Sequence, residues 1–127
     1  MSTLEVSNLN DGTTTVATTY VTNGSAKAWT TYNQSTNSLL DSFNISSQSD
    51  DATGRTTSSF ATSFGNVNYS VAGCIFDGTG ANDVRVIGHD MGTDTYTASA
   101  LKVYTAQGDG ALNDAERLFL NLHGDLA

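Results

Sequence analysis

The sequence predicts an all-β protein: a single-domain antiparallel β-sandwich of jelly-roll-like kind. First, the chain contains 19 threonines, and aromatic residues make up 9% of it; both residue types suit a half-buried pleated strand. Second, good helix formers are scarce, because only two methionines and five lysines and arginines are present among 127 residues. Third, short apolar segments recur between turn signals at a spacing of about 8–12 residues, which is typical of sandwiches and barrels.

The N-terminal residues 1–12 are expected to form an extended arm, and residues 13–127 the sandwich domain. Leu4 and Val6 fall on one face of an extended chain, Leu9 follows, and Asn10–Gly12 marks a turn. Beyond it, the β-branched run from Thr13 to Thr22 favours a strand.

The dipeptide Asn23-Gly24 is the strongest hairpin signal in the chain, because both residues tolerate positive φ. It predicts that the run from Thr13 to Thr22 pairs with a strand over Ala26 to Tyr32. That second strand alternates, and its two faces would carry Lys27, Trp29 and Thr31 on one side and Ala28, Thr30 and Tyr32 on the other.

Three further strands are expected in the middle of the chain: Leu39 to Ser46, Arg55 to Phe64 and Asn68 to Phe76. The turn between the first two would cover Ser49 to Gly54. Both faces of the third are apolar, which predicts a central strand or an interface strand. Within it, the apolar neighbours of Cys74 predict a buried thiol.

The C-terminal part alternates loops rich in Gly and Asp with short apolar runs. Strands are expected over Val84 to Ile87 and Thr95 to Tyr104. The run from Glu116 to Leu122 fits a helix capped by Asn113 or Asp114, and it fits a strand equally well; we assign it as the last strand. The loops between these runs are Asp77–Asp83, Gly88–Asp94 and Ala106–Asp114.

Charge excludes several classes of partner. Five basic against 13 acidic residues give a net charge of −8, so the chain has no basic face for phosphates, and we expect neither nucleic-acid binding nor attraction to anionic membranes. No apolar run is long enough to span a bilayer, so no membrane insertion is expected. Lys27 is the first basic residue and no apolar segment accompanies it, which argues against a secretory signal.

No residue pattern indicates an enzyme, and we expect no catalytic residue, no cofactor and no metal. His89 and His123 lie in Gly/Asp loops without a nucleophile motif, and Asp50-Asp51 is expected in a turn. The loop from Asp77 to Asp83 offers oxygen atoms at alternate positions but lacks the closing Glu of an EF-hand, so weak calcium binding stays open beside a solvated loop. Aromatic side chains could stack on sugars, although core or interface positions are the simpler interpretation: Trp29, Tyr32, Tyr96 and Tyr104.

The sequence contains no proline and only two lysines, the residues with which monomeric sheet proteins commonly protect their edges. We therefore expect neighbouring subunits to pair with or cover the sheet edges, although β-bulges and short edge strands would protect them as well.

Several ordered motifs resemble tail-fibre-like virion structural proteins of aquatic tailed bacteriophages, of the cyanophage or marine type. They are Met1–Val6, Gly24–Asn33, Asp41–Ser47, Asp51–Gly54 with Ser58–Phe64, Val67–Gly73 and Leu118–Asp125. The chain departs from that pattern at Gly65, where the family usually has Pro, and in the loop Tyr32–Asn37.

The resemblance implies a non-enzymatic virion protein, made in the cytoplasm of the bacterial host and forming a homotrimer on the tail or capsid surface. A short tail fibre or tail tip that attaches to the host is the first hypothesis, with Leu4, Val6 and Leu9 docking on other virion proteins. The outward loops that would meet a host-surface glycan contain Asp77, Thr79, Asn82, Asp83, His89, Asp90, Asp94 and Asp109. A capsid decoration or tail-ring protein and a stand-alone carbohydrate-binding module are the alternatives.

Overall fold

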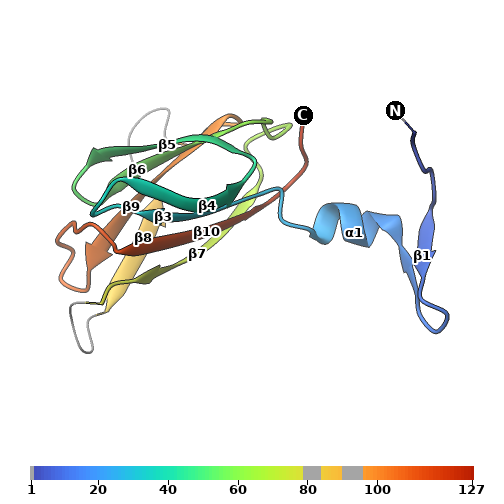
Figure 1. Cartoon of the computed structure of the whole chain (residues 1–127), viewed down its shortest axis with the longest axis horizontal. Helices are drawn as coiled ribbons and strands as arrows, with labels where there is room; N and C mark the ends of the chain where they lie inside the picture. The colour runs from blue at the N-terminus through green and yellow to red at the C-terminus, as the bar shows by residue number, and fades with distance from the viewer. Residues whose placement is uncertain (1, 79–83, 90–95) are drawn as a thin grey trace.

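The computed structural model describes residues 2–78, 84–89 and 96–127 and shows an all-β fold with antiparallel sheets (Figure 1). The all-β prediction is therefore confirmed. The only helix among the described residues is α1 (Thr18–Gly24), which lies near the N-terminus.

A small hairpin precedes this helix. Strand β1 (Asn8–Asn10) pairs with β2 (Thr15–Ala17) around a turn in which Gly12 has a φ of +97°. The Asp11 carboxylate accepts hydrogen bonds from the backbone N–H groups of Thr13 and Thr14, at 2.9 and 2.7 Å. Both bonds lower the pKa of Asp11, and the bond from Thr14 has the larger effect.

The predicted strand from Thr13 to Thr22 is wrong beyond Ala17, and Asn23-Gly24 ends a helix instead of turning a hairpin. The physical reason is the lack of a partner strand, because β1 pairs only with Thr15–Ala17. After Ala17 the backbone bonds to itself, and the Ser25 N–H donates to the Val21 carbonyl at 3.2 Å. Local hydrogen bonding thus outweighs the weak β preference of threonine.

The rest of the chain forms two four-stranded sheets. The first, which we call the 3–10 sheet, has the order β4-β3-β10-β7. The second, the 6–9 sheet, has the order β5-β6-β9-β8. The strands of the 3–10 sheet are β3 (Ala28–Asn33), β4 (Ser38–Phe43), β7 (Ser70–Phe76) and β10 (Arg117–His123). Those of the 6–9 sheet are β5 (Ile45–Ala52), β6 (Arg55–Phe60), β8 (Arg85–His89) and β9 (Ala100–Gln107).

The chain passes from one sheet to the other at Asn44, so the predicted strand from Leu39 to Ser46 is two strands. Asn44 has a φ of +56°, a conformation that asparagine tolerates better than most residues. Its side chain fixes the crossing, because its amide donates to the carbonyls of Lys27 and Thr62, both at 3.0 Å, and its oxygen accepts from the Thr62 N–H at 2.7 Å.

Buried side chains from both sheets meet in one cluster. Along β3 the residues Ala28, Thr30 and Tyr32 are buried, which confirms the predicted alternation. The terminal segment is a strand, as assigned, and it occupies an interior position beside β3 and β7. The buried cluster consists of Ala28, Phe60, Phe64, Tyr69, Leu101, Val103, Leu118, Leu120 and Leu122.

Three expectations for the middle of the chain need correction. The predicted turn at Ser49–Gly54 is confined to Thr53 and Gly54, so Asp50 and Asp51 lie on β5. Strand β7 is an edge strand with most of its residues exposed, so the central alternative is wrong, and the interface alternative stays a prediction. Cys74 is exposed. It pairs with Phe119, and both side chains lie on the outer face of the sheet, whereas Leu118 and Leu120 lie on the inner face, toward the buried cluster.

Candidate functional site

The predicted recognition loops fall only partly within the described residues. Thr79, Asn82, Asp83, Asp90 and Asp94 lie outside them. Asp77, His89 and Asp109 lie within them.

Asp77 and Asp109 lie at the same end of the fold. Asp77 follows β7, whose end pairs with the start of β10, and Asp109 follows β9, whose end approaches Asn113 and Gln34. The Asp77 carboxylate forms an ion pair with Arg85 at 2.6 Å, and both side chains are mostly buried. Asp109 accepts a hydrogen bond from the Ala111 N–H at 2.9 Å in an exposed turn. Asp77 is therefore engaged within the fold, and the Asp109 turn is open to solvent.

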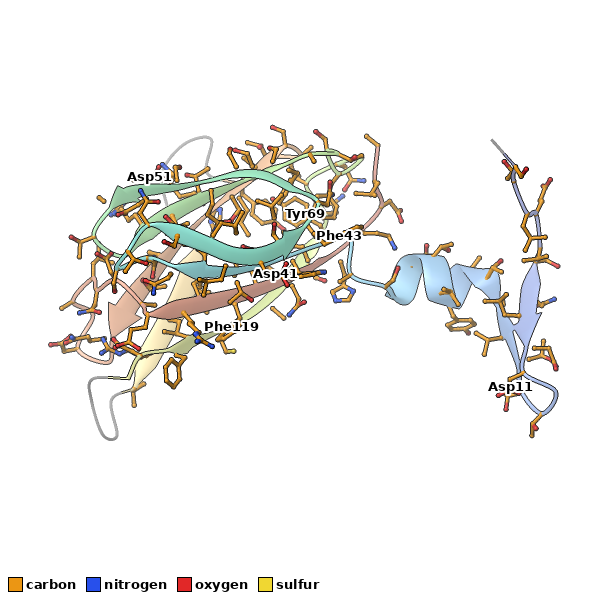
Figure 2. The ribbon with its side chains drawn as sticks, viewed as in Figure 1. Asp11, Asp41, Phe43, Asp51, Tyr69 and Phe119 are labelled. Carbon is orange, nitrogen blue, oxygen red and sulfur yellow. The ribbon has the colours of Figure 1, made fainter. Side chains whose placement is uncertain are left out.

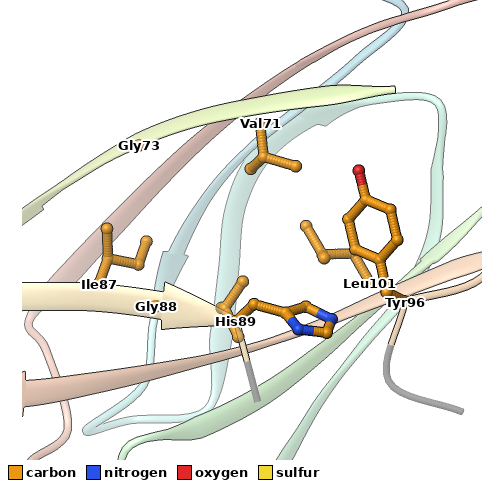
Figure 3. Close-up of a pocket in the computed structure, with 8 residues that line it drawn as sticks. Val71, Gly73, Ile87, Gly88, His89, Tyr96 and Leu101 are labelled. Carbon is orange, nitrogen blue, oxygen red and sulfur yellow. The ribbon is translucent and has the colours of Figure 1, made fainter. Parts of the chain in front are cut away.

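His89 lies elsewhere, at a pocket of about 300 Å³ between the edge strands β7 and β8 (Figure 3). Its ring meets the Tyr96 ring edge-on, with centroids 5.0 Å apart and an interplanar angle of 82°. Most of the lining is aliphatic or glycine: Val71, Gly73, Ile87, Gly88, Leu101 and Val103, with His89 and Tyr96. The structure therefore brings His89 to an apolar hollow and not to Asp77 or Asp109.

Tyr96 continues an aromatic series into the core. It stacks on Tyr69 with centroids 4.5 Å apart, and Tyr69 stacks on Phe64 at 4.3 Å. The Tyr96 hydroxyl donates to the Tyr69 carbonyl, and the Tyr69 hydroxyl donates to the Thr97 carbonyl at 2.9 Å. Burial raises the pKa of Tyr96; burial and then the neighbouring Tyr96 raise that of Tyr69. Both phenols therefore stay protonated at neutral pH and act as hydrogen-bond donors.

The lining of this pocket is suited to binding a ligand through apolar contacts. One face of the Tyr96 ring is covered by Tyr69, and the His89 imidazole lies nearly perpendicular to that ring. A ligand with an apolar face could lie against the aliphatic lining and bond to the imidazole, as ligands with polar and apolar sides commonly do. Among the residues that the structure describes, no group of three or more His, Cys, Asp or Glu side chains is arranged to hold a metal ion.

In the structure the segment outside the two four-stranded sheets runs from Ser2 to Ser25, beyond the predicted boundary at residue 12, and we call all of it the N-terminal arm. It presents apolar side chains to solvent. Leu4 is 83% exposed and Tyr20 75%, and Val6 and Leu9 are also exposed. No residue between Ser2 and Ser25 is buried. Figure 1 shows this segment beyond the end of the two sheets at which β3 begins, opposite the end that carries Asp77 and Asp109.

The outer face of the 3–10 sheet was not predicted as one surface, although interface positions were considered for Trp29 and for the strand from Asn68 to Phe76. Trp29 pairs with Phe43 across the two strands, and Phe119 pairs with Cys74 and Thr31. These residues alternate with the buried ones, so they point outward together; Figure 2 labels Phe43 and Phe119 on this sheet. In β3 and β10, the residues that alternate with the buried ones include Trp29 and Phe119, and this pattern can be seen in the sequence. That the two side chains share one face follows only from the order of the strands in the sheet.

No family model, no curated protein and no solved structure matches this chain. Within the described parts of the chain, no helix is long and apolar enough to cross a membrane.

Proposed function

We propose that this chain is a non-enzymatic structural protein of a bacteriophage virion, a short tail fibre or tail-tip protein that takes part in attachment to the host. In this proposal the two sheets form a jelly-roll-like β-sandwich, the sandwiches assemble as a homotrimer, and the N-terminal arm docks on other virion proteins. The motif resemblance supports the virion assignment, and the structure supports docking through the arm.

The arm is the observation that carries the docking proposal. It exposes Leu4, Val6, Leu9 and Tyr20 while burying none of its own residues. An isolated two-stranded hairpin is marginally stable in water, and so is a helix as short as the seven residues of α1. Such a segment gains stability when another surface covers its apolar side chains.

The positions of the arm and of the Asp109 turn, at opposite ends of the two sheets, agree with this role. The arm lies at one end of the sheets, and the Asp109 turn lies at the other (Figure 1). A protein anchored by its arm would therefore present the Asp109 turn outward, on a rigid scaffold of strands, where recognition loops are commonly found.

The experiment compares particles that carry the wild-type chain with particles that carry an arm variant. Serine at Leu4, Val6 and Leu9 together is expected to abolish incorporation into the virion, with the sheet domain still folded by circular dichroism. The matched control is Val84→Ser, which removes another exposed apolar side chain from the sheet domain. Normal incorporation of the arm variant would overturn docking through the arm, and normal host adsorption by particles that lack the protein would overturn the attachment role.

A capsid decoration or tail-ring protein is the nearest alternative, because an exposed apolar arm would serve it equally well. Copy number separates the two. Hundreds of copies per particle would favour the capsid, whereas a few dozen or fewer would favour the tail.

The pocket of His89 and Tyr96 favours a second candidate, a stand-alone carbohydrate-binding module. Sugars bind proteins through apolar C–H faces on aromatic rings together with a few polar contacts. A glycan array should then show binding that Tyr96→Ala removes. The absence of any glycan signal, together with stable incorporation into virions, would eliminate this candidate.

A further inference from the structure

The two outer faces of the fold differ in chemistry. The outer face of the 3–10 sheet, which we call the aromatic face, gathers apolar side chains from all four strands: Trp29, Phe43, Ala72, Cys74, Phe76 and Phe119. Phe43 and Phe76 are 53% and 52% exposed. Aromatic residues are enriched in protein interfaces and are costly to leave in water.

The outer face of the 6–9 sheet is an internal comparison. Its side chains are mainly hydroxyls and charges, because Ser47 pairs with Ser59, Ser49 with Thr57, and Thr57 with Lys102. Tyr104, which pairs with Arg55, is an aromatic residue on this face. Lys102 forms an ion pair with Asp51 at 3.1 Å. This hydroxyl face is suited to water, so the apolar character of the other face is not a general property of the surface.

Charge indicates which partner suits the aromatic face. Among the strand residues that point outward there, the acid is Asp41 and the strong base is Arg117, with His123 at the end of β10. The face is thus neutral, although the chain carries a net charge of −8. Two copies repel each other at long range, but contact through this face brings no excess of like charges together. The Asp41 of one copy can then pair with the Arg117 of the other, which is the reciprocal contact of a symmetric interface.

From these observations we infer that the aromatic face binds a second copy of this chain. The inference goes beyond the proposed function, because a face that binds its own counterpart reciprocally forms a twofold pair, a contact distinct from those around the threefold axis of the proposed homotrimer. Four strands about 4.8 Å apart and about six residues long span roughly 400 Å² in projection, within the size range of functional patches on monomers. A standard interface buries about 800 Å² on each partner, so the exposed β4 edge, to which Leu40 belongs, must add to it.

Sedimentation of the full-length protein at micromolar concentration tests the inference. The wild type is expected to sediment as an oligomer. Phe43→Lys is expected to raise the dissociation constant at least about tenfold, the factor that corresponds to 1.4 kcal/mol. The matched control, Ser59→Lys, places the same charge on the hydroxyl face and should leave the oligomer intact. Unchanged thermal unfolding of each variant monomer would show that the fold is preserved. If the lysine variant unfolds, sedimentation of Phe43→Ser gives a second measurement of the dissociation constant.

A charge exchange tests the reciprocal pair. Asp41→Arg and Arg117→Asp should each weaken association, and the double variant should restore it. Oligomers that survive Phe43→Lys and Phe43→Ser would overturn the inference, as would a monomeric wild type. A monomeric wild type that still enters virions would leave docking through the arm standing. Loss of association in the Leu4, Val6 and Leu9 variant alone would assign the interface to the arm instead.

Discussion

Gln34 shows how much one buried side chain can hold together. Its amide nitrogen donates to the Thr56 hydroxyl at 2.9 Å. Its oxygen accepts from the Thr105 hydroxyl at 2.9 Å and from the Ala115 N–H at 2.8 Å. One residue after β3 thus joins the 6–9 sheet to the segment that leads into β10.

Replacing Gln34 by Ala should destabilise the fold by roughly 2–4 kcal/mol. The substitution leaves the Thr56 hydroxyl and the Ala115 N–H without this buried partner, whereas the Thr105 hydroxyl keeps its bond to the Asn113 carbonyl. An unsatisfied buried group costs about 1–3 kcal/mol. Urea unfolding measures the change. Gln107→Ala is the control, because Gln107 is only partly buried, and it should change stability by less than about 0.5 kcal/mol. Equal losses from the two variants would contradict the importance of the Gln34 bonds.

Asp51 contributes to stability in a way that depends on pH. Burial alone would raise its pKa, but hydrogen bonds from Thr57 and Ser49 and the nearby Lys102 outweigh burial and lower the pKa below its ordinary value of 3.8. A lowered pKa in the folded state adds stability above pH 3.8, and this stability is lost as the pH falls through the folded pKa.

Asp51→Asn should therefore lower the free energy of unfolding at pH 7 by less than about 1 kcal/mol, since the Lys102 pair is partly exposed. At pH 2 to 3, the wild type and the variant should converge. Denaturant titrations at both pH values measure this. A gap between the two proteins that stays constant down to the lowest pH would show that the carboxylate charge is not the cause.

At the scale of the elements, the β5–β6 hairpin depends on its turn residue. Gly54 has a φ of +65°, and a Cβ there would lie 2.4 Å from the Thr105 carbonyl oxygen and 2.9 Å from the Asn113 nitrogen. Its own N–H donates to the Asp114 carboxylate at 2.5 Å, and its carbonyl accepts from the Thr105 N–H at 2.8 Å. Gly54 is therefore packed tightly against the backbone of Thr105 and Asn113, with no space for a Cβ.

Gly54→Ala should cost at least about 2 kcal/mol, because it combines the left-handed penalty of roughly 1–2 kcal/mol with a collision against backbone atoms. Gly110→Ala separates the two effects. Gly110 also has a positive φ, of +88°, but nothing lies within 4 Å of an added Cβ. Thermal unfolding should rank the Gly54 variant clearly below the Gly110 variant; similar midpoints would mean that the collision relaxes at little cost.

The elements also show how far the sequence could be interpreted. Alternation predicted the buried residues of β3, and the assignment of the last strand was confirmed, because in each case one face is uniformly buried. The helix α1 was missed because β-branched residues favour a strand only where a partner strand exists.

The candidate sites were predictable only in part. The exposed residues Leu4, Val6 and Leu9 were identified as an apolar arm, and their exposure agrees with that description. The pocket of His89 and the aromatic face were not predicted. Both depend on which strands become neighbours across distant parts of the chain: β7 beside β10, and β8 at the edge beside β9.

At the scale of the whole molecule, net charge opposes association through any face. A charge of −8 on each copy produces long-range repulsion. The Debye length falls from about 30 Å at 0.01 M salt to about 10 Å at 0.1 M, so salt reduces that repulsion. Salt does not screen the attraction between the apolar side chains of the aromatic face, because that attraction does not depend on charge.

We therefore expect association to tighten as salt rises from about 0.01 M to about 0.2 M, by at least about threefold in the dissociation constant. Sedimentation at the two salt concentrations measures it, with Phe43→Lys as the control that should stay dissociated in both. Weaker association at the higher salt would instead identify ion pairs, such as Asp41 with Arg117, as the dominant attraction.

The exposed arm also bears on the order in which an assembly can be built. Fixing a backbone costs about 1–2 kcal/mol per residue, and a hairpin and a seven-residue helix with no buried side chains recover little of that cost by themselves. The arm can then become rigid only on a receptacle that already exists. In the proposed docking, newly made copies would remain free of the particle, as monomers or as their own oligomers, until that receptacle is complete, and each would be a late addition to a finished scaffold.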